Sequence, residues 1–265
     1  RGMWDNLLFV FAGDNGGVCH DGGSNFPLRG GKFSNWEGGV RSAAFISGGV
    51  VPPAVRGGSF TGIVSLTDHA MTFLELAGLP ASALGTKPGH ASVPPPDGVS
   101  YVGSILQNRT SARRTEVYIT DGTLRVGEWK LMVENPGGRE LVGTGGGWVY
   151  PATGPAERYP NISTGCGPSK AAPHGYIDPV DHFVCTGCNR SVPCLFRVGA
   201  AAPYGNDANE STNVAAANPD VVKALQARLA AIEATLWTPP PVTPNTGGAC
   251  AAATGKYGGV VGPWQ

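Results

Sequence analysis

The sequence predicts an α/β protein in two parts. Residues 1–98 are expected to be the C-terminal part of an α/β domain, and residues 99–265 a smaller α+β domain with an antiparallel sheet and a packed C-terminal helix. Three observations support this fold class: a continuous apolar run near the start, short strand-like runs in the second half, and one long amphipathic helix near the end.

The first strand is predicted over residues 6–12, which form a continuous apolar run of strand length. Such a run is typical of a strand that is buried on both faces of a mainly parallel sheet. A glycine-rich loop follows to about residue 39, and residues 40–47 are expected to form another buried strand.

A helix is predicted over residues 67–78, with Thr67 or Asp68 as the cap at its start and Gly78 at its end. The segment 80–98 is rich in proline, glycine and small residues. It is therefore expected to be a loop at the boundary between the two parts.

In the second part, residues 116–120 and 124–133 have strand-like character and are separated by Asp121-Gly122, which is a hairpin signal. Residues 195–198 fit one more strand. Residues 138–193 are irregular, and disulfides are expected to stabilise them.

The clearest helix is predicted over residues 219–236, because Pro219 suits its first position. Apolar residues recur there at helical spacing: Val221, Val222, Leu225, Leu229, Ile232 and Leu236. The helix is therefore expected to cover a sheet, and a proline- and glycine-rich tail follows from Thr238.

The charge balance excludes partners that need a strong global field. The chain has 265 residues, 19 of them basic and 19 acidic, so no overall charge favours nucleic acid or an anionic membrane. No run of about 18 apolar residues is present, so no ordinary transmembrane helix is expected.

The six cysteines form an even set, which favours disulfides. They are Cys19, Cys166, Cys185, Cys188, Cys194 and Cys250. Zinc is the competing interpretation, because Cys185 and Cys188 have the C-x-x-C spacing, but a second such pair is absent.

Four acceptor sequons predict N-linked glycans, at Asn108, Asn161, Asn189 and Asn209. Together with the cysteines they indicate passage through the secretory pathway. A secreted, extracellular or lysosome-like location is expected.

Asp14 and Asn15 follow the first predicted strand, at the end where ligands gather in open α/β sheets. A carboxylate and a carboxamide offer hard oxygen ligands, which suit Ca²⁺ or Mg²⁺. Further oxygen donors would have to come from elsewhere. The alternative is that Asp14-Asn15-Gly16 is simply a tight turn.

Basic residues follow in the next loop. Lys32 is a mobile point charge that could meet a tetrahedral anion, whereas Arg29 could brace the loop. Glu37 and Arg41 are expected to be internal bracing. His69 in the predicted helix is expected to be structural, and His20 is a weak site candidate.

Taken in order, these motifs closely resemble the second half of the formylglycine-dependent (type I) sulfatases, with arylsulfatase B-like members the most similar. The matching segments are Asp14-Asn15-Gly16-Gly17, Pro27-Leu28-Arg29-Gly30-Gly31-Lys32, Trp36-Glu37-Gly38-Gly39-Val40-Arg41, Leu124-Arg125-Val126-Gly127-Glu128-Trp129-Lys130-Leu131, the Asn218-Pro219 helix and Gly262-Pro263-Trp264. The resemblance implies an alkaline-phosphatase-like fold and the hydrolysis of sulfate esters, on sulfated sugars or aryl sulfates.

The resemblance also implies residue roles. Asp14 and Asn15 match calcium ligands, with Mg²⁺ less favoured, and Lys32 matches the lysine that contacts the sulfate group. A divalent ion would neutralise sulfate oxygens, and the lysine would stabilise charge as the sulfur–oxygen bond breaks.

The family's nucleophile is a formylglycine made from a cysteine in a C-x-P/A-S-R motif, which the resemblance places before residue 1. Cys166-Gly167-Pro168-Ser169-Lys170 is a near match that we interpret as chance. The chain alone is therefore expected to be inactive.

Two alternatives stay open: a non-catalytic sulfatase-like glycoprotein with a binding or structural role, and another metal-dependent hydrolase such as a phosphatase. Nothing in the sequence names the ester, pairs the cysteines or fixes whether the protein is an oligomer.

Overall fold

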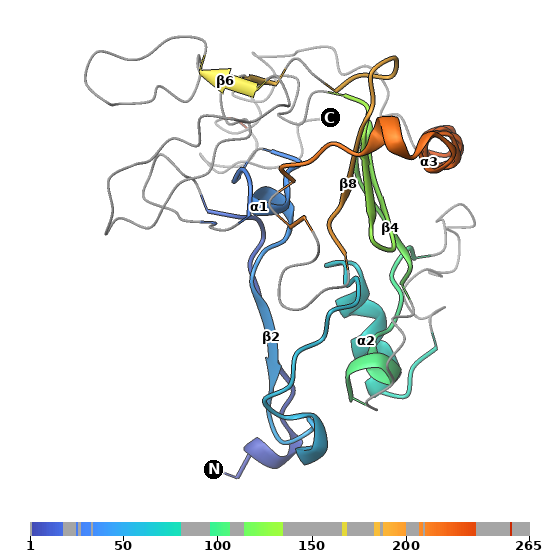
Figure 1. Ribbon diagram of the computed structural model, residues 1–265. Helices are drawn as coiled ribbons and strands as arrows, with labels where there is room; N and C mark the ends of the chain where they lie inside the picture. The colour runs from blue at the N-terminus through green and yellow to red at the C-terminus, as the bar shows by residue number, and fades with distance from the viewer. Residues whose placement is uncertain are drawn as a thin grey trace, which may run out of the picture. The chain divides into compact units, whose positions relative to one another are not determined.

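A computed structural model gives the fold of the chain (Figure 1). It describes residues 2–17, 25, 28–32, 34–80, 96–106, 114–134, 166–168, 183–185, 188–199, 207–208, 210–236 and 255. The chain divides into two compact units, Arg1–Ala231 and Ile232–Gln265, and the elements below lie almost wholly in the first. The predicted division near residue 98 stays a prediction.

Strands form within both predicted ranges, but they pair as an antiparallel ribbon with exposed side chains, so their predicted burial in a parallel sheet is wrong. Strand β1, Phe9–Ala12, pairs with β2, Ala44–Ser47, in the register Phe9 to Ser47 and Ala12 to Ala44. Neither strand has a second neighbour among the described residues. The burial of β1 agrees with this, since the side chains of Phe9 and Phe11 are exposed.

Short helical turns lie between the other elements of the first unit. The short helix α1, Glu37–Val40, occupies part of the loop and of the predicted second strand. Further turns are η1 (Trp4–Asn6), η3 (Pro53–Val55), the π-helical turn η5 (Val102–Leu106) and η6 (Ala215–Ala217).

Helix α2, Asp68–Leu76, confirms the helix predicted there, but its start is not capped as expected. Thr67 makes no side-chain cap, and the Asp68 carboxylate instead accepts hydrogen bonds from the backbone N–H groups of Ser65 and Val99. Gly78 follows the helix with φ 68°, a left-handed conformation that suits glycine, so the predicted end is confirmed.

The first unit contains a four-stranded antiparallel sheet, called the central sheet below, in the order β3-β4-β5-β8. Its strands are β3 (Glu116–Thr120), β4 (Thr123–Val126), β5 (Trp129–Met132) and β8 (Cys194–Arg197). The hairpin predicted at Asp121-Gly122 is confirmed, as is the strand near residue 195. The predicted run 124–133 is two strands, because the chain turns at Gly127, where φ is 55°.

Two further elements complete the description. Helix α3, Pro219–Glu233, confirms the last predicted helix and buries Val222, Leu225 and Leu229. Strands β6 (Cys166–Pro168) and β7 (Phe183–Cys185) pair separately within the region predicted to be irregular.

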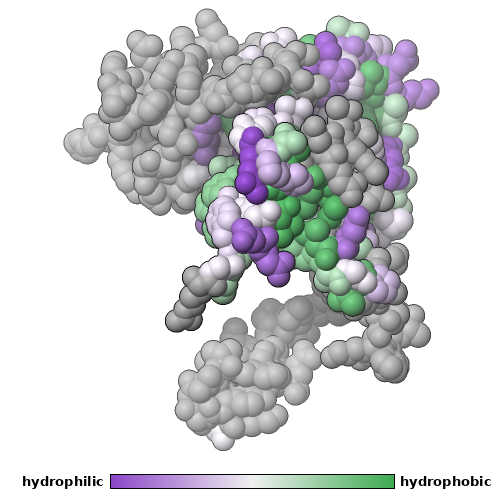
Figure 2. All heavy atoms as spheres, turned by 90° about the horizontal axis from the view of Figure 1, so that it is seen from below, coloured by the Kyte–Doolittle hydropathy of each residue, from purple (hydrophilic) through white to green (hydrophobic). Residues whose placement is uncertain are grey.

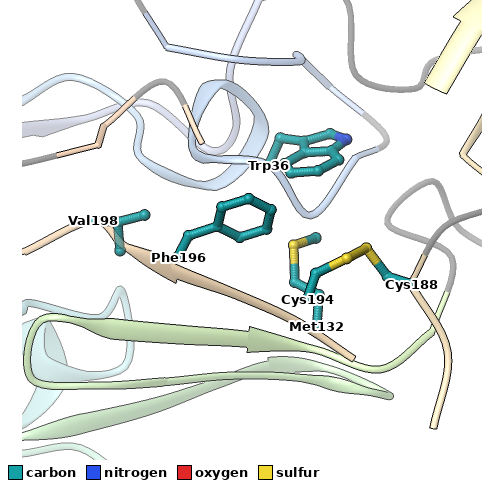
Figure 3. Close-up of a cluster of buried hydrophobic side chains, with 6 residues drawn as sticks. All are labelled: Trp36, Met132, Cys188, Cys194, Phe196 and Val198. Atoms are coloured by element: carbon teal, nitrogen blue, oxygen red, sulfur yellow. A yellow bond between two sulfur atoms is a disulfide. The ribbon is translucent and has the colours of Figure 1, made fainter. Parts of the chain in front are cut away.

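A buried apolar cluster joins the turn before α1 to the central sheet (Figure 3). It contains Trp36, Met132, Cys188, Cys194, Phe196 and Val198. The rings of Trp36 and Phe196 meet edge to face, with centroids 5.6 Å apart. This packing fixes the Trp36-to-Arg41 segment on the sheet, and that segment in turn supports the candidate site.

Candidate active site

The loop after β1 is held by backbone contacts to the segment around α1. The N–H of Gly13 donates to Ala43 O at 2.9 Å, and that of Gly16 to Gly39 O at 2.8 Å. A Cβ at Gly16 would overlap the carbonyl oxygen of Gly38, so the close approach needs glycine there. Asp14 and Asn15 therefore sit on a loop whose backbone has a fixed position.

Asp14 and Asn15 supply two hard oxygen donors side by side. Asp14 is exposed, and its Oδ1 accepts the N–H of Asn15 at 2.9 Å. Asn15 donates from Nδ2 to Gly16 O at 2.9 Å, which leaves its Oδ1 as an acceptor. The same local bonds are typical of a tight turn, so they fit both the metal-ligand interpretation and the turn interpretation of this segment. The donor chemistry fits part of a calcium shell, which takes about 6–8 oxygens.

The backbone of Lys32 lies against the same loop, since its N–H donates to Gly17 O at 3.2 Å. Lys32 is half-buried. The structure thus brings the backbone of Lys32 to the Asp14–Gly17 segment, while the role of its ammonium group stays a prediction.

Asn25 clamps this arrangement, and the sequence analysis missed it. Its Oδ1 accepts the N–H of Gly17 at 2.8 Å, and its Nδ2 donates to Gly17 O at 2.9 Å and Gly30 O at 3.0 Å. One carboxamide therefore joins the acidic loop to the basic loop. A lone asparagine in a glycine-rich loop carries no sequence signal for such a role.

Arg29 braces the basic loop, as predicted. Its guanidinium stacks on the Trp36 ring, 3.6 Å from the centroid, and donates to Glu210 O at 3.0 Å. Burial lowers the pKa of Arg29 to about 10, and the neighbouring charges of Glu210 and Asp207 partly oppose this. The group remains a cation at neutral pH.

Glu37 is almost fully buried and is surrounded by cations. Lys130 Nζ lies 3.0 Å from its Oε1, while Arg125 and Arg41 approach its Oε2 to 3.5 Å and 3.6 Å. These cations lower the pKa of Glu37 below its ordinary value, although burial alone would raise it. The predicted bracing role of Glu37 and Arg41 is confirmed.

Glu210 completes a buried charge cluster with Glu37, Lys130, Arg125 and Arg41. Nothing in its sequence context indicated this. Its Oε1 lies 2.8 Å from Lys130 Nζ, and its Oε2 accepts the N–H of Glu37 at 2.6 Å. Burial raises the pKa of Glu210 to about 7; the charge of Lys130 opposes this rise and the charge of Glu37 adds to it. Glu210 also has φ 49°, a left-handed conformation rarely seen outside glycine, so the cluster holds it in place.

A cleft of about 1420 Å³ lies beside this loop and extends along the ribbon. Its polar lining includes Asp14, Asn15, Arg41 and Arg125. Apolar residues of β1 and β2 also line it, and apolar atoms gather on the face seen in Figure 2. The cleft is large enough for a sugar-sized ligand.

His69 also lines the cleft and packs as a structural residue, as predicted. Its Nδ1 lies 2.9 Å from the Tyr101 hydroxyl, and its ring meets that of Tyr101 edge to face. Burial raises the pKa of the Tyr101 hydroxyl above its ordinary value. His20 lies outside the described residues.

The cysteines behave partly as predicted. Cys188 and Cys194 form a disulfide, so the zinc alternative fails at Cys188. Cys166 and Cys185 are backbone partners in the β6–β7 register. Cys19 and Cys250 lie outside the described residues, as do the sequon asparagines Asn108, Asn161 and Asn209.

Two features are absent from the described residues. No group of three or more His, Cys, Asp or Glu side chains gathers there in a metal-binding arrangement. Within the same residues, the helices are too short or too polar to cross a bilayer.

No protein-family model matches the chain. Arylsulfatase J of Mus musculus is 37% identical to it over 76 residues, which are 29% of this chain and 12% of that protein.

Among solved structures, the chain is similar to BT33336S-sulf, described under "Metabolism of multiple glycosaminoglycans by bacteroides thetaiotaomicron is orchestrated by a versatile core genetic locus". The TM-score is 0.52 at 20% identity, over 88% of this chain and 40% of that one. The chain thus shares the fold of this structure but spans less than half of its length. The match to arylsulfatase J and this shared fold both agree with the resemblance of the chain to sulfatases.

Proposed function

We propose that the chain supplies part of the active site of a calcium-dependent sulfuric ester hydrolase that acts on sulfated sugars. The observation that carries the proposal is the placement of Asp14 and Asn15, adjacent oxygen donors on a braced loop that line a sugar-sized cleft. The 76-residue similarity to an arylsulfatase supports the same reaction class.

In this proposal Asp14 and Asn15 hold the metal ion, which when bound neutralises sulfate oxygens and orients the ester. Lys32 binds the sulfate group and stabilises the charge that develops as the ester bond breaks. Asn25, Arg29 and the Glu37 cluster act indirectly, because they fix the two loops that carry these residues.

The formylglycine nucleophile and the other calcium ligands are proposed to come from sequence beyond these 265 residues. Among the described residues, Asp14 belongs to no group of three or more His, Cys, Asp or Glu side chains that could hold a metal ion. A secreted or lysosome-like location agrees with the Cys188–Cys194 disulfide, since such bonds persist in oxidising compartments.

The second candidate is a non-catalytic sulfatase-like glycoprotein that binds sulfated carbohydrate. It is considered because Asp14 and Asn15, the ligands proposed from the described residues, would hold calcium weakly as two oxygen donors alone. In this case the cleft would bind its ligand without turnover.

The test is a sulfatase assay on the native polypeptide that contains this chain, with an aryl sulfate and sulfated disaccharides, in calcium and in chelator. Turnover that needs calcium and is lost in Asp14→Asn supports the proposal. Asp5→Asn is the matched control, because Asp5 is exposed and lies outside the cleft.

Binding of the sulfated disaccharide without turnover would establish the non-catalytic alternative. Faster turnover of a phosphate ester than of the matched sulfate ester would instead identify a phosphatase.

A further inference from the structure

Asn189 lies at the start of a short loop that the Cys188–Cys194 disulfide closes. The two cysteines are 4% and 2% exposed and belong to the buried cluster around Trp36. Asn189, Arg190, Ser191 and Val192 are all exposed. The loop is therefore anchored at its base and open to solvent at its tip.

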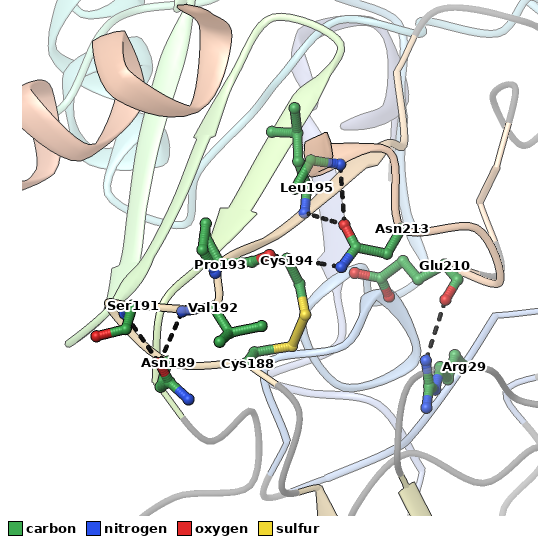
Figure 4. Close-up of a disulfide and its surroundings, with 11 residues drawn as sticks. Arg29, Cys188, Asn189, Ser191, Val192, Pro193, Cys194, Leu195, Glu210 and Asn213 are labelled. Atoms are coloured by element: carbon green, nitrogen blue, oxygen red, sulfur yellow. Dashed lines mark hydrogen bonds between the residues drawn. A yellow bond between two sulfur atoms is a disulfide. The ribbon is translucent and has the colours of Figure 1, made fainter. Parts of the chain in front are cut away.

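The carboxamide of Asn189 has a fixed orientation (Figure 4). Its Oδ1 accepts the backbone N–H groups of Ser191 and Val192, both at 2.8 Å. The backbone N–H of Asn189 donates to Val192 O at 2.9 Å. The oxygen and nitrogen of an amide diverge from the same carbon. Holding Oδ1 against the backbone thus turns Nδ2 away from it, and Nδ2 meets no acceptor in the described part of the chain.

We infer that Asn189 is an N-glycosylation site that carries an oligosaccharide on Nδ2. The residues Asn189-Arg190-Ser191 form an acceptor sequon, and the structure presents its nitrogen to solvent. Transfer forms a bond between the anomeric carbon and Nδ2 and breaks the bond from that carbon to the pyrophosphate of a lipid-linked donor. Nδ2 loses one proton to solvent.

Two features of the site agree with this modification. The neighbouring disulfide requires the oxidising compartment in which such transfer takes place. The exposed loop residues do not line the cleft, so a glycan there leaves the cleft open. The inference concerns Asn189 alone and does not depend on the proposed function.

The test is peptide mass analysis of the full chain secreted from eukaryotic cells, before and after enzymatic deglycosylation. The peptide with Asn189 is expected to carry a glycan in the wild type and in Ser191→Thr, which keeps the sequon. Asn189→Gln and Ser191→Ala are expected to lose it. Ser191→Ala is the sharper variant, because Ser191 bonds Asn189 only through its backbone N–H.

An unmodified Asn189 peptide in a sample whose other sequons are occupied would overturn the inference. If the variants are not secreted, the wild-type and Ser191→Thr peptides decide the question on their own. The readout is a mass and not an activity, so an inactive protein would not affect the result.

Discussion

The ammonium group of Lys130 lies 3.0 Å from the carboxylate of Glu37, and neither side chain is more than 1% exposed. Lys130 comes from β5, and Glu37 begins α1 beside the candidate site. The pair links the central sheet to the loop system that carries Asp14 and Lys32. Loss of this ion pair is therefore expected to disturb the position of the loops that form the candidate site.

Replacing Lys130 by methionine is expected to destabilise the protein by about 3–5 kcal/mol, because it leaves Glu37 and Glu210 buried without their shared cation. Chemical denaturation of Lys130→Met measures this change. Lys223→Met is the matched control, since Lys223 is exposed on α3 and should unfold like the wild type. An equal loss of stability in both variants would contradict the stabilising role of the buried charge cluster.

The raised pKa of Glu210 predicts that stability increases as the pH falls from 8 toward about 5. The folded carboxyl has a pKa of about 7 and the unfolded one an ordinary value of 4.5, so the folded state binds more protons between these values. Glu210 thus favours folding at low pH and loses this contribution as the pH rises through 7. Below 4.5 the trend reverses, because Glu37 and Asp68 have lowered pKa values.

Thermal unfolding from pH 5 to 8 measures this dependence. Glu210→Gln cannot titrate and should show a flatter profile over the same range. An unchanged profile in the variant would mean that another group is responsible.

The sequence could predict local structure but not the buried charge cluster. The hairpin at Asp121-Gly122 and the helix at Pro219 follow from neighbouring residues, so their patterns were sufficient. Lys130 and Glu210 lie 93 and 173 residues from Glu37, and ordinary sequence periodicity does not connect such distant charges. Their burial depends on the tertiary fold.

The candidate site was proposed on a different basis, and the roles of its residues stay predictions. Asp14, Asn15 and Lys32 belong to motifs that resemble those of a known family. This resemblance can be seen in the sequence without knowing which contacts the residues make. Asn25 contributes hydrogen bonds to the backbone of Gly17 and Gly30, and many side chains could occupy a glycine-rich loop. Its role emerges once both loops are seen together.

Gly16→Ala is expected to displace the loop that carries Asp14 and to cost about 1–3 kcal/mol, because the added Cβ overlaps the Gly38 carbonyl. The rise in melting temperature on adding calcium should be smaller in this variant. Gly255→Ala is the control, since a Cβ there meets nothing within 4 Å. A full calcium response in Gly16→Ala would argue against a fixed metal loop.

The aromatic face of the β1–β2 ribbon predicts that the 265-residue chain associates when it is expressed alone. Phe9, Phe11 and Phe45 are 47%, 47% and 53% exposed, and the Phe11 and Phe45 rings stack with centroids 5.1 Å apart. A two-stranded ribbon is marginally stable by itself, and such exposed patches promote association. Phe45→Lys should therefore reduce both light scattering and the binding of an apolar fluorescent dye. Val192→Lys is the control, because Val192 is 57% exposed on the separate disulfide loop, and an equal effect there would show that the ribbon is not the associating surface.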